Sequence, residues 1–136
     1  MFSRPTTEQL LAGIAEELRT VVASEVQTET TKIMLQQIDQ ILMGCSRRAA
    51  HEIAWVHEEA EKIGALTGKP IGQPASLHLE DVLAWYHQVS SLLSDEVGAA
   101  FRSGDQSRID AVQEVLDARS AIEMQVLGAL DLVGRG

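Results

Sequence analysis

One long stretch of the sequence, from Glu29 to Leu66, contains no proline and keeps its apolar residues three and four positions apart. That spacing is typical of one face of an α-helix, so the pattern predicts a single helix over 29–66. At 1.5 Å per residue such a helix would be roughly 55 Å long. We expect it either to bend near Gly44 or to overhang and pack on another subunit. Its apolar face is formed by Ile38, Ile41, Leu42, Cys45, Ala49, Ile53, Val56, Ala60 and Ile63.

The same spacing predicts a helix before this stretch, and glycine and proline predict a loop after it. Thr6 and Gln9 have the spacing of a capping box, in which the two side chains bond each other's backbone N–H groups. We therefore expect the first helix over about 6–26. Three glycines and two prolines interrupt the sequence after the long helix, which predicts a loop over 64–76.

Two further helices are predicted in the second half of the chain. Apolar residues at helical spacing predict one over about 77–102. Ser107 and Asp110 resemble a capping pair for the other, over about 107–133. No stretch alternates polar and apolar residues over the length of a strand. We therefore expect an all-α fold, with residues 1–136 forming one domain of four antiparallel helices and a long second helix.

Composition argues against several classes of partner and location. The chain has 20 acidic and 11 basic residues and a formal net charge of -9. A protein that binds the phosphate backbone of a nucleic acid needs clustered Lys and Arg side chains. We therefore expect no nucleic-acid partner. The single Cys45 cannot form an internal disulfide, which favours the reducing cytoplasm. No apolar run approaches a signal peptide or a membrane span, so we expect no membrane insertion.

Several charged residues fall within the apolar arcs of the predicted helices when they are placed at about 100° per residue. Burial of an unpaired carboxylate costs several kcal/mol, so such groups must pair, take up protons, bind a ligand or lie at an interface. We therefore predict that separate helices bring charged side chains together in the interior. The candidate cluster comprises Arg48, Glu52, Glu59, Glu96, Arg119 and Glu123.

Three interpretations of this cluster remain open. Arg48 with Glu52 and Arg119 with Glu123 are spaced four apart, which suits salt bridges that fix helix register or line a subunit interface. The excess of acid alternatively suits a bound cation or small ligand. An enzyme that uses paired carboxylates as acid and base is the third interpretation, and we regard it as less favoured than a non-enzymatic role.

Motifs for common catalytic and metal centres do not fit this sequence. His51 and His57 are six residues apart, whereas the zinc-protease motif needs two histidines four apart on one helix face. None of the four histidines follows a glutamate by three residues, as a di-iron bundle requires. Cys45 lies on the apolar arc and is expected to be a buried small hydrophobe. The sequence therefore nominates no catalytic residue, and it leaves the metal ligands and any cofactor unknown.

The first half of the chain also carries a set of short helical motifs. They are Arg4-Pro5-Thr6, Leu10-Leu11, Glu17-Leu18, Val21-Val22, Glu25-Val26, Arg47-Arg48-Ala49-Ala50-His51-Glu52-Ile53-Ala54-Trp55 and Glu58-Glu59. In these motifs the chain resembles a family of small uncharacterised bacterial helical proteins, encoded near aminoglycoside-phosphotransferase-like kinases and acyl-CoA dehydrogenases. The resemblance implies a cytoplasmic accessory role near acyl-CoA or related metabolism, through contact with one of those enzymes. It supplies no catalytic residues.

Together these observations favour an interaction or accessory protein without an enzymatic activity of its own. We expect a homodimer or another protein partner, with the long helix and the acidic faces choosing that partner. The alternative is a bundle that binds a small ligand or cation at the charged cluster.

Overall fold

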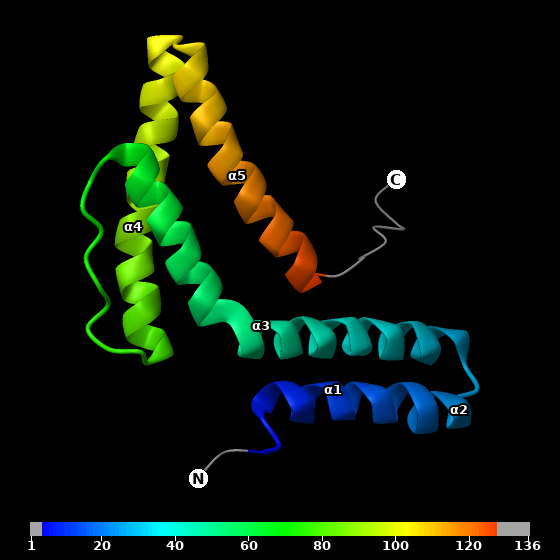
Figure 1. Cartoon of the computed structure of the whole chain (residues 1–136). Coiled ribbons are helices and arrows are strands. Elements are labelled where there is room, and N and C mark those ends of the chain that lie inside the picture. The colour runs from blue at the N-terminus through cyan, green and yellow to red at the C-terminus, as the bar shows by residue number, and fades with distance from the viewer. Residues whose placement is uncertain (1–3, 128–136) are drawn as a thin grey trace. The chain divides into compact units, whose positions relative to one another are not determined.

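The computed structural model describes residues 4–127, and every regular element in that range is a helix (Figure 1). The predicted all-α fold with a long second helix is confirmed. The part of the fourth helix that was expected beyond residue 127 lies outside the described residues. The elements are α1 (Thr7–Glu17), the π-helical turn η1 (Leu18–Val22), α2 (Ala23–Glu25), α3 (Glu29–Thr67), α4 (Leu79–Ser103) and α5 (Gln106–Leu127).

Short polar residues and glycines set the helix ends. The capping box predicted for α1 is present, because Thr6 Oγ1 accepts from Gln9 N and Gln9 Oε1 accepts from Thr6 N. Gly104, at φ 66°, ends α4 in the left-handed conformation that glycine adopts without strain. Asp105 then caps α5 by accepting from the backbone N–H of Ser107.

Two boundaries differ from those expected. The predicted loop begins at residue 64, but α3 continues through Gly64 and ends at Thr67, after which Gly68 takes φ 65°. The connection to α4 therefore spans residues 68–78. The expected cap of Ser107 with Asp110 is also wrong, because Asp105 takes that role and α5 begins at Gln106.

The chain divides into two compact units, and α3 and α5 contribute to both. The described part of unit 1 comprises residues 4–52 and 123–127, and unit 2 comprises residues 53–122. Each unit has its own interior. The expectation that residues 1–136 form one domain stays a prediction.

Unit 2 packs the end of α3 against α4 and α5 around a buried apolar core. In this unit α5 runs antiparallel to both of the other helices, whereas α4 runs parallel to α3, because the connection 68–78 returns along the helices before α4 begins (Figure 1). This pair departs from the antiparallel arrangement expected for all neighbours. Trp85 Nε1 holds the connection by donating to the carbonyl of Gly72 at 2.8 Å. The core consists of Ala60, Ile63, Val82, Trp85, Val89, Leu93 and Val115.

Unit 1 is a helical hairpin in which α1, η1 and α2 run antiparallel to the first part of α3 (Figure 1). Two contacts set its register. Ser46 Oγ donates to the carbonyl of Glu8 at 3.0 Å, and Arg19 Nε lies 3.0 Å from Asp39 Oδ1. The hairpin buries little, since its fully buried residues within the described range are Ala15, Gly44 and Ser46.

The last turn of α5 covers one side of α3 in unit 1. Arg47 Nη2 donates to the carbonyl of Val126 at 3.1 Å. A cation at this place also suits the negative end of the α5 dipole. The close approach requires glycine at position 44, because a Cβ there would stand 2.9 Å from the Val126 carbonyl oxygen.

Over residues 4–127, no helix combines the length and the apolar character needed to cross a bilayer.

Candidate functional site

The most enclosed charged side chain among residues 4–127 lies in unit 2, where α3, α4 and α5 each contribute to one hydrogen-bonded cluster. Glu59 on α3 is 8% exposed, and its Oε1 accepts from Arg119 Nε on α5 at 2.6 Å. Its Oε2 accepts from the Tyr86 hydroxyl on α4. Arg119 Nη2 donates to the Tyr86 hydroxyl at 3.3 Å and to Ser90 Oγ at 3.4 Å. Both carboxylate oxygens and the guanidinium are thus bound by side chains of the chain itself.

The electrostatics of this cluster favour the neutral phenol and the charged guanidinium. Burial raises the pKa of Tyr86 to about 12, and the hydrogen bond to the Glu59 carboxylate adds to that rise. For Arg119, burial alone would lower the pKa, but the hydrogen bond and the charge of Glu59 raise it overall. Tyr86 therefore keeps its proton at neutral pH, which makes it a donor to Glu59 and unsuited to act as a general base.

A second ion pair in unit 2 joins Glu96 on α4 to Arg108 in the first turns of α5. It is bidentate, with Arg108 Nε donating to Oε1 and Nη2 donating to Oε2, the latter at 2.9 Å. The hydrogen bond from Arg108 lowers the pKa of Glu96 and exceeds the opposing effect of burial. This fork-shaped pairing ties the two helices together beside the Gly104 turn.

The remaining candidates lie in unit 1. Arg48 donates to Glu52 one helical turn later, as the spacing predicts, with Arg48 about half exposed. Glu123 is exposed, which contradicts its expected place within the apolar arc of its helix. Its predicted partner Arg119 pairs with Glu59 instead. The sequence reasoning did not nominate Arg108, Tyr86 or Ser90.

Four of the six predicted residues therefore form two separate pairs, Arg48 with Glu52 and Arg119 with Glu59. Glu96 pairs with Arg108, which was not predicted, and Glu123 is exposed. Each buried carboxylate among them is satisfied by a cation or a hydroxyl of the chain, which is the arrangement of a structural network. Among residues 4–127, no three His, Cys, Asp or Glu side chains are placed so that they could hold a metal ion. The charged candidates thus show no feature that calls for a ligand.

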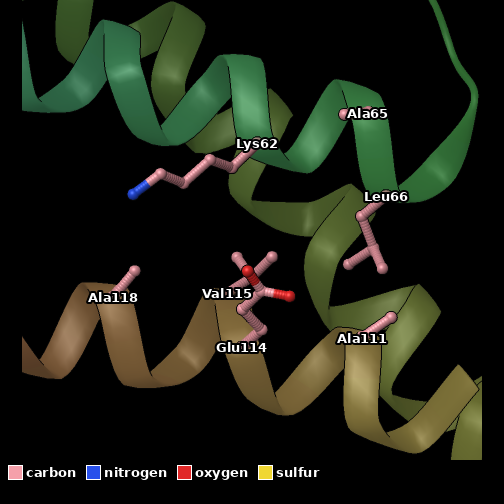
Figure 2. A pocket seen from close by; sticks show the side chains of 7 residues that line it. All are labelled: Lys62, Ala65, Leu66, Ala111, Glu114, Val115 and Ala118. Carbon is pink, nitrogen blue, oxygen red and sulfur yellow. The ribbon is translucent and has the colours of Figure 1, made fainter. Parts of the chain in front are cut away.

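A groove of about 280 Å³ lies between α3 and α5 in unit 2 (Figure 2). Figure 2 shows Leu66 and Ala111 pointing toward one another across it, with Lys62 extending from α3. Of its lining residues, Lys62 and Glu114 carry charge, and the others are alanine, leucine and valine. Such a lining suits apolar contact and provides no nucleophile with an adjacent base.

An uncovered row of large apolar side chains lies along α1 in unit 1. Leu10, Ile14 and Val22 line a shallow depression of about 510 Å³ together with Gly13 and Leu18. Leu10, Ile14 and Val22 are each 40–53% exposed. The π-helical turn Leu18–Val22 explains why Val22 continues the row. A π-helical turn contains one residue more than an α-helical turn, so each later residue takes the place on the helix face that its predecessor would otherwise have.

A matching row lies along the first part of α3. Met34, Ile38 and Ile41 are 42–65% exposed and follow each other in steps of four and three. Cys45 continues the row and is exposed, which contradicts its expected burial. The helical wheel correctly placed Ile38, Ile41 and Cys45 on one face, but no other described segment of unit 1 covers that face.

Both rows lie on the same side of the hairpin. Ala15 on α1 and Asp39 on α3 mark the line where the two helices meet. At about 100° per residue, each apolar row lies roughly 120° around its helix from that line, in the same rotational sense. Because the helices are antiparallel, equal rotations bring both rows to one side. We call this surface the apolar face of unit 1; its members are Leu10, Ile14, Val21, Val22, Met34, Ile38 and Ile41.

Comparison with known proteins adds no relative: no family model, curated protein or solved structure matches the chain. The resemblance to the bacterial helical family therefore stays a prediction.

Proposed function

We propose that this chain is a non-enzymatic helical interaction protein that associates with a second copy of itself through the apolar face of unit 1. The observation that carries the proposal is the contrast between what unit 1 buries and what it exposes. Its hairpin fully buries only small residues in the described range, whereas seven large apolar side chains on one face are 40–65% exposed. A two-helix hairpin gains its stability by covering such a face with further helices.

The extent of the face supports a specific contact. The seven side chains expose on the order of 600 Å² together, which is at the upper end for the largest apolar patch on a typical monomer, and such patches are often functional. Specific interfaces bury about 800 Å² per partner, so the face and its surrounding side chains approach what a dimer needs. Two such hairpins placed face to face would make a four-helix bundle.

The distribution of charge also favours self-association through unit 1. The sequence of unit 2 contains eleven acidic and five basic residues, whereas that of unit 1 contains nine acidic and six basic residues. Contact between two copies through unit 1 therefore brings together the units that carry the smaller excess of acid. The single exposed thiol of Cys45 is compatible with a reducing compartment such as the cytoplasm.

Sedimentation velocity over a range of concentrations tests the proposal. We expect the wild-type chain to dimerise and Ile41→Glu to raise the dimer Kd by about 100-fold or more, because two carboxylates would be buried in the contact. Phe101→Glu in α4 is the matched control, since Phe101 is 63% exposed and Ile41 65% exposed. A wild-type chain that stays monomeric at every concentration would overturn the proposal, and so would equal effects of the two variants.

A further inference from the structure

One ionisable side chain lies among the apolar residues that α1 contributes to the apolar face of unit 1. Glu17 lines the shallow depression along this helix together with Leu10, Ile14 and Val22, and of the residues that line it only Glu17 can carry a charge. It follows Ile14 by one helical turn and comes directly before the π-helical turn that ends at Val22. Glu17 is exposed, so in a single chain water hydrates its carboxylate.

The Glu17 carboxylate has no partner within the described part of the chain. It makes no hydrogen bond or ion pair with any residue in 4–127. Its neighbour Glu16 differs, because a Glu16 oxygen lies 3.1 Å from Arg19 Nη2. Arg19 Nε in turn lies 3.0 Å from Asp39 Oδ1, on the side where α1 meets α3. The guanidinium that stands next to Glu17 in sequence is therefore engaged by two other carboxylates.

The helices packed against α1 in unit 1 also offer Glu17 no free cation. The register of the hairpin places it at the height of Ile38 on α3. Along α3 the basic residues on either side of Ile38 are Lys32 and Arg47, roughly 9 Å and 14 Å away at 1.5 Å per residue. Lys32 is held in an ion pair, and Arg47 donates to the last turn of α5. The described part of α5 in unit 1 carries one charged residue, Glu123, which is itself acidic.

A second copy that covers the apolar face removes water from this carboxylate. Glu17 lies between the two ends of the α1 row, Leu10 and Val22, so it is covered whichever way the second hairpin points. The ionised form then loses its hydration without gaining a cation, which opposes association. The second copy brings the same set of charges, including a Glu17 of its own, so repulsion between like charges adds to the cost. The neutral, protonated side chain carries neither penalty.

We infer that the Glu17 carboxylate limits self-association at neutral pH, and that its protonation strengthens self-association. This inference rests on the self-association proposed above and adds its regulation. Because the dimer favours the neutral form, it binds more protons than two separate chains do. The stability of the dimer relative to the separate chains therefore rises as the pH falls.

Sedimentation velocity of the full chain at neutral pH gives the first test. Glu17→Gln keeps the shape of the side chain and removes its charge, so we expect it to lower the dimer Kd about tenfold. Glu16→Gln is the matched control, because Glu16 is the adjacent exposed glutamate and its ion pair with Arg19 lies away from the depression. We expect the control to change the Kd by less than about twofold.

The same measurement at acid pH gives the second test. Between about pH 7.5 and about pH 5, the Kd of the wild-type chain should fall by a factor about three times larger than that of Glu17→Gln. The variant has no carboxylate to protonate at this position. Comparison of the two chains removes the general effect of a smaller net charge, which both chains share.

Three outcomes would overturn this role of Glu17 while leaving self-association intact. They are a Glu17→Gln dimer no tighter than the wild-type dimer, equal responses of the two chains to pH, and equal tightening by Glu16→Gln. Wild-type and Glu17→Gln chains that both stay monomeric at every concentration would instead overturn the proposed function, and this inference with it.

Discussion

Arg119 and Glu59 lie sixty positions apart in the sequence, yet Arg119 Nε donates to Glu59 Oε1 at 2.6 Å. The pair joins α5 to α3 and includes Tyr86 of α4, so one guanidinium and one carboxylate connect all three helices of unit 2. Because these groups use their hydrogen-bonding capacity on one another, their hydrogen bonds serve to hold the three helices in register. The consequences for stability can be measured directly.

Removal of the carboxylate should destabilise the protein. We expect Glu59→Ala to lower the free energy of unfolding by about 2 kcal/mol or more, because Arg119 and Tyr86 would be left partly buried without their partner. Urea unfolding followed by circular dichroism measures this. Glu123→Ala is the control, and it should stay within about 0.5 kcal/mol because Glu123 is exposed. Equal effects of the two substitutions would contradict the assignment of Glu59 as the buried acid.

Tyr86 should titrate well above its ordinary range. It is the only tyrosine in the sequence, so the near-ultraviolet absorbance of tyrosinate reports this residue alone. The midpoint should lie at about 12 in the folded protein, owing to burial and the Glu59 hydrogen bond, and near 10.0 in urea. Because the folded pKa is the higher one, the stabilisation from protonated Tyr86 is complete below pH 10 and is lost as pH rises toward 12. A folded midpoint near 10 would show that Tyr86 is hydrated.

Glu96 should contribute to acid sensitivity. Its pKa is lowered by the Arg108 hydrogen bond, so the ionised pair stabilises the fold above the ordinary carboxyl value of 4.5. That contribution is lost as pH falls through the lower folded pKa. We expect the difference in unfolding free energy between wild type and Glu96→Gln to be constant above pH 5 and to shrink on acidification. A difference that does not change with pH would exclude an ionic contribution from this pair.

Two glycine substitutions should act in opposite directions. Gly44→Ala should cost about 1–3 kcal/mol, because its Cβ would meet the Val126 carbonyl oxygen and displace the end of α5 from Arg47. Gly13→Ala meets no atom within 4 Å, so it should stabilise α1 by up to about 1 kcal/mol through helix propensity. Thermal unfolding of both variants tests the contact, and a stabilising Gly44→Ala would show that α5 does not approach α3 there.

The helices themselves could be predicted from the sequence because their determinants are local. Apolar spacing, the capping box at Thr6 and the glycines that end α3 and α4 all act within a few residues. The start of α5 was predicted one residue too late, because Asp105 caps the helix in place of Ser107. The Asp105 carboxylate accepts from the backbone N–H of Ser107 itself. The parallel course of α3 and α4 was not predictable from these signals, because a loop's composition does not reveal the direction in which it travels.

The charged site was predicted only in part, for a reason that lies in the helical wheel itself. A wheel shows which side of a helix a residue occupies, and it placed Arg119 and Glu59 in or beside their apolar arcs. It does not show which neighbouring helix covers that side at a given height. Arg119 was therefore matched with Glu123 on its own helix, although it pairs with Glu59. Cys45 was expected to be buried, but no described segment of unit 1 covers it and it is exposed.

The path of residues 68–78 constrains what can be removed from the chain. An extended segment of eleven residues reaches at most about 36–40 Å, while a helix of 25 residues such as α4 is about 37 Å long. The segment crosses much of the length of its neighbours and is tethered midway, where Trp85 holds Gly72. Each deleted residue removes about 3.3–3.6 Å of that reach, so the length of the segment limits where α4 can begin. A segment too short to reach the present start of α4 would force the helix to begin elsewhere, and the core built on its present direction would be lost.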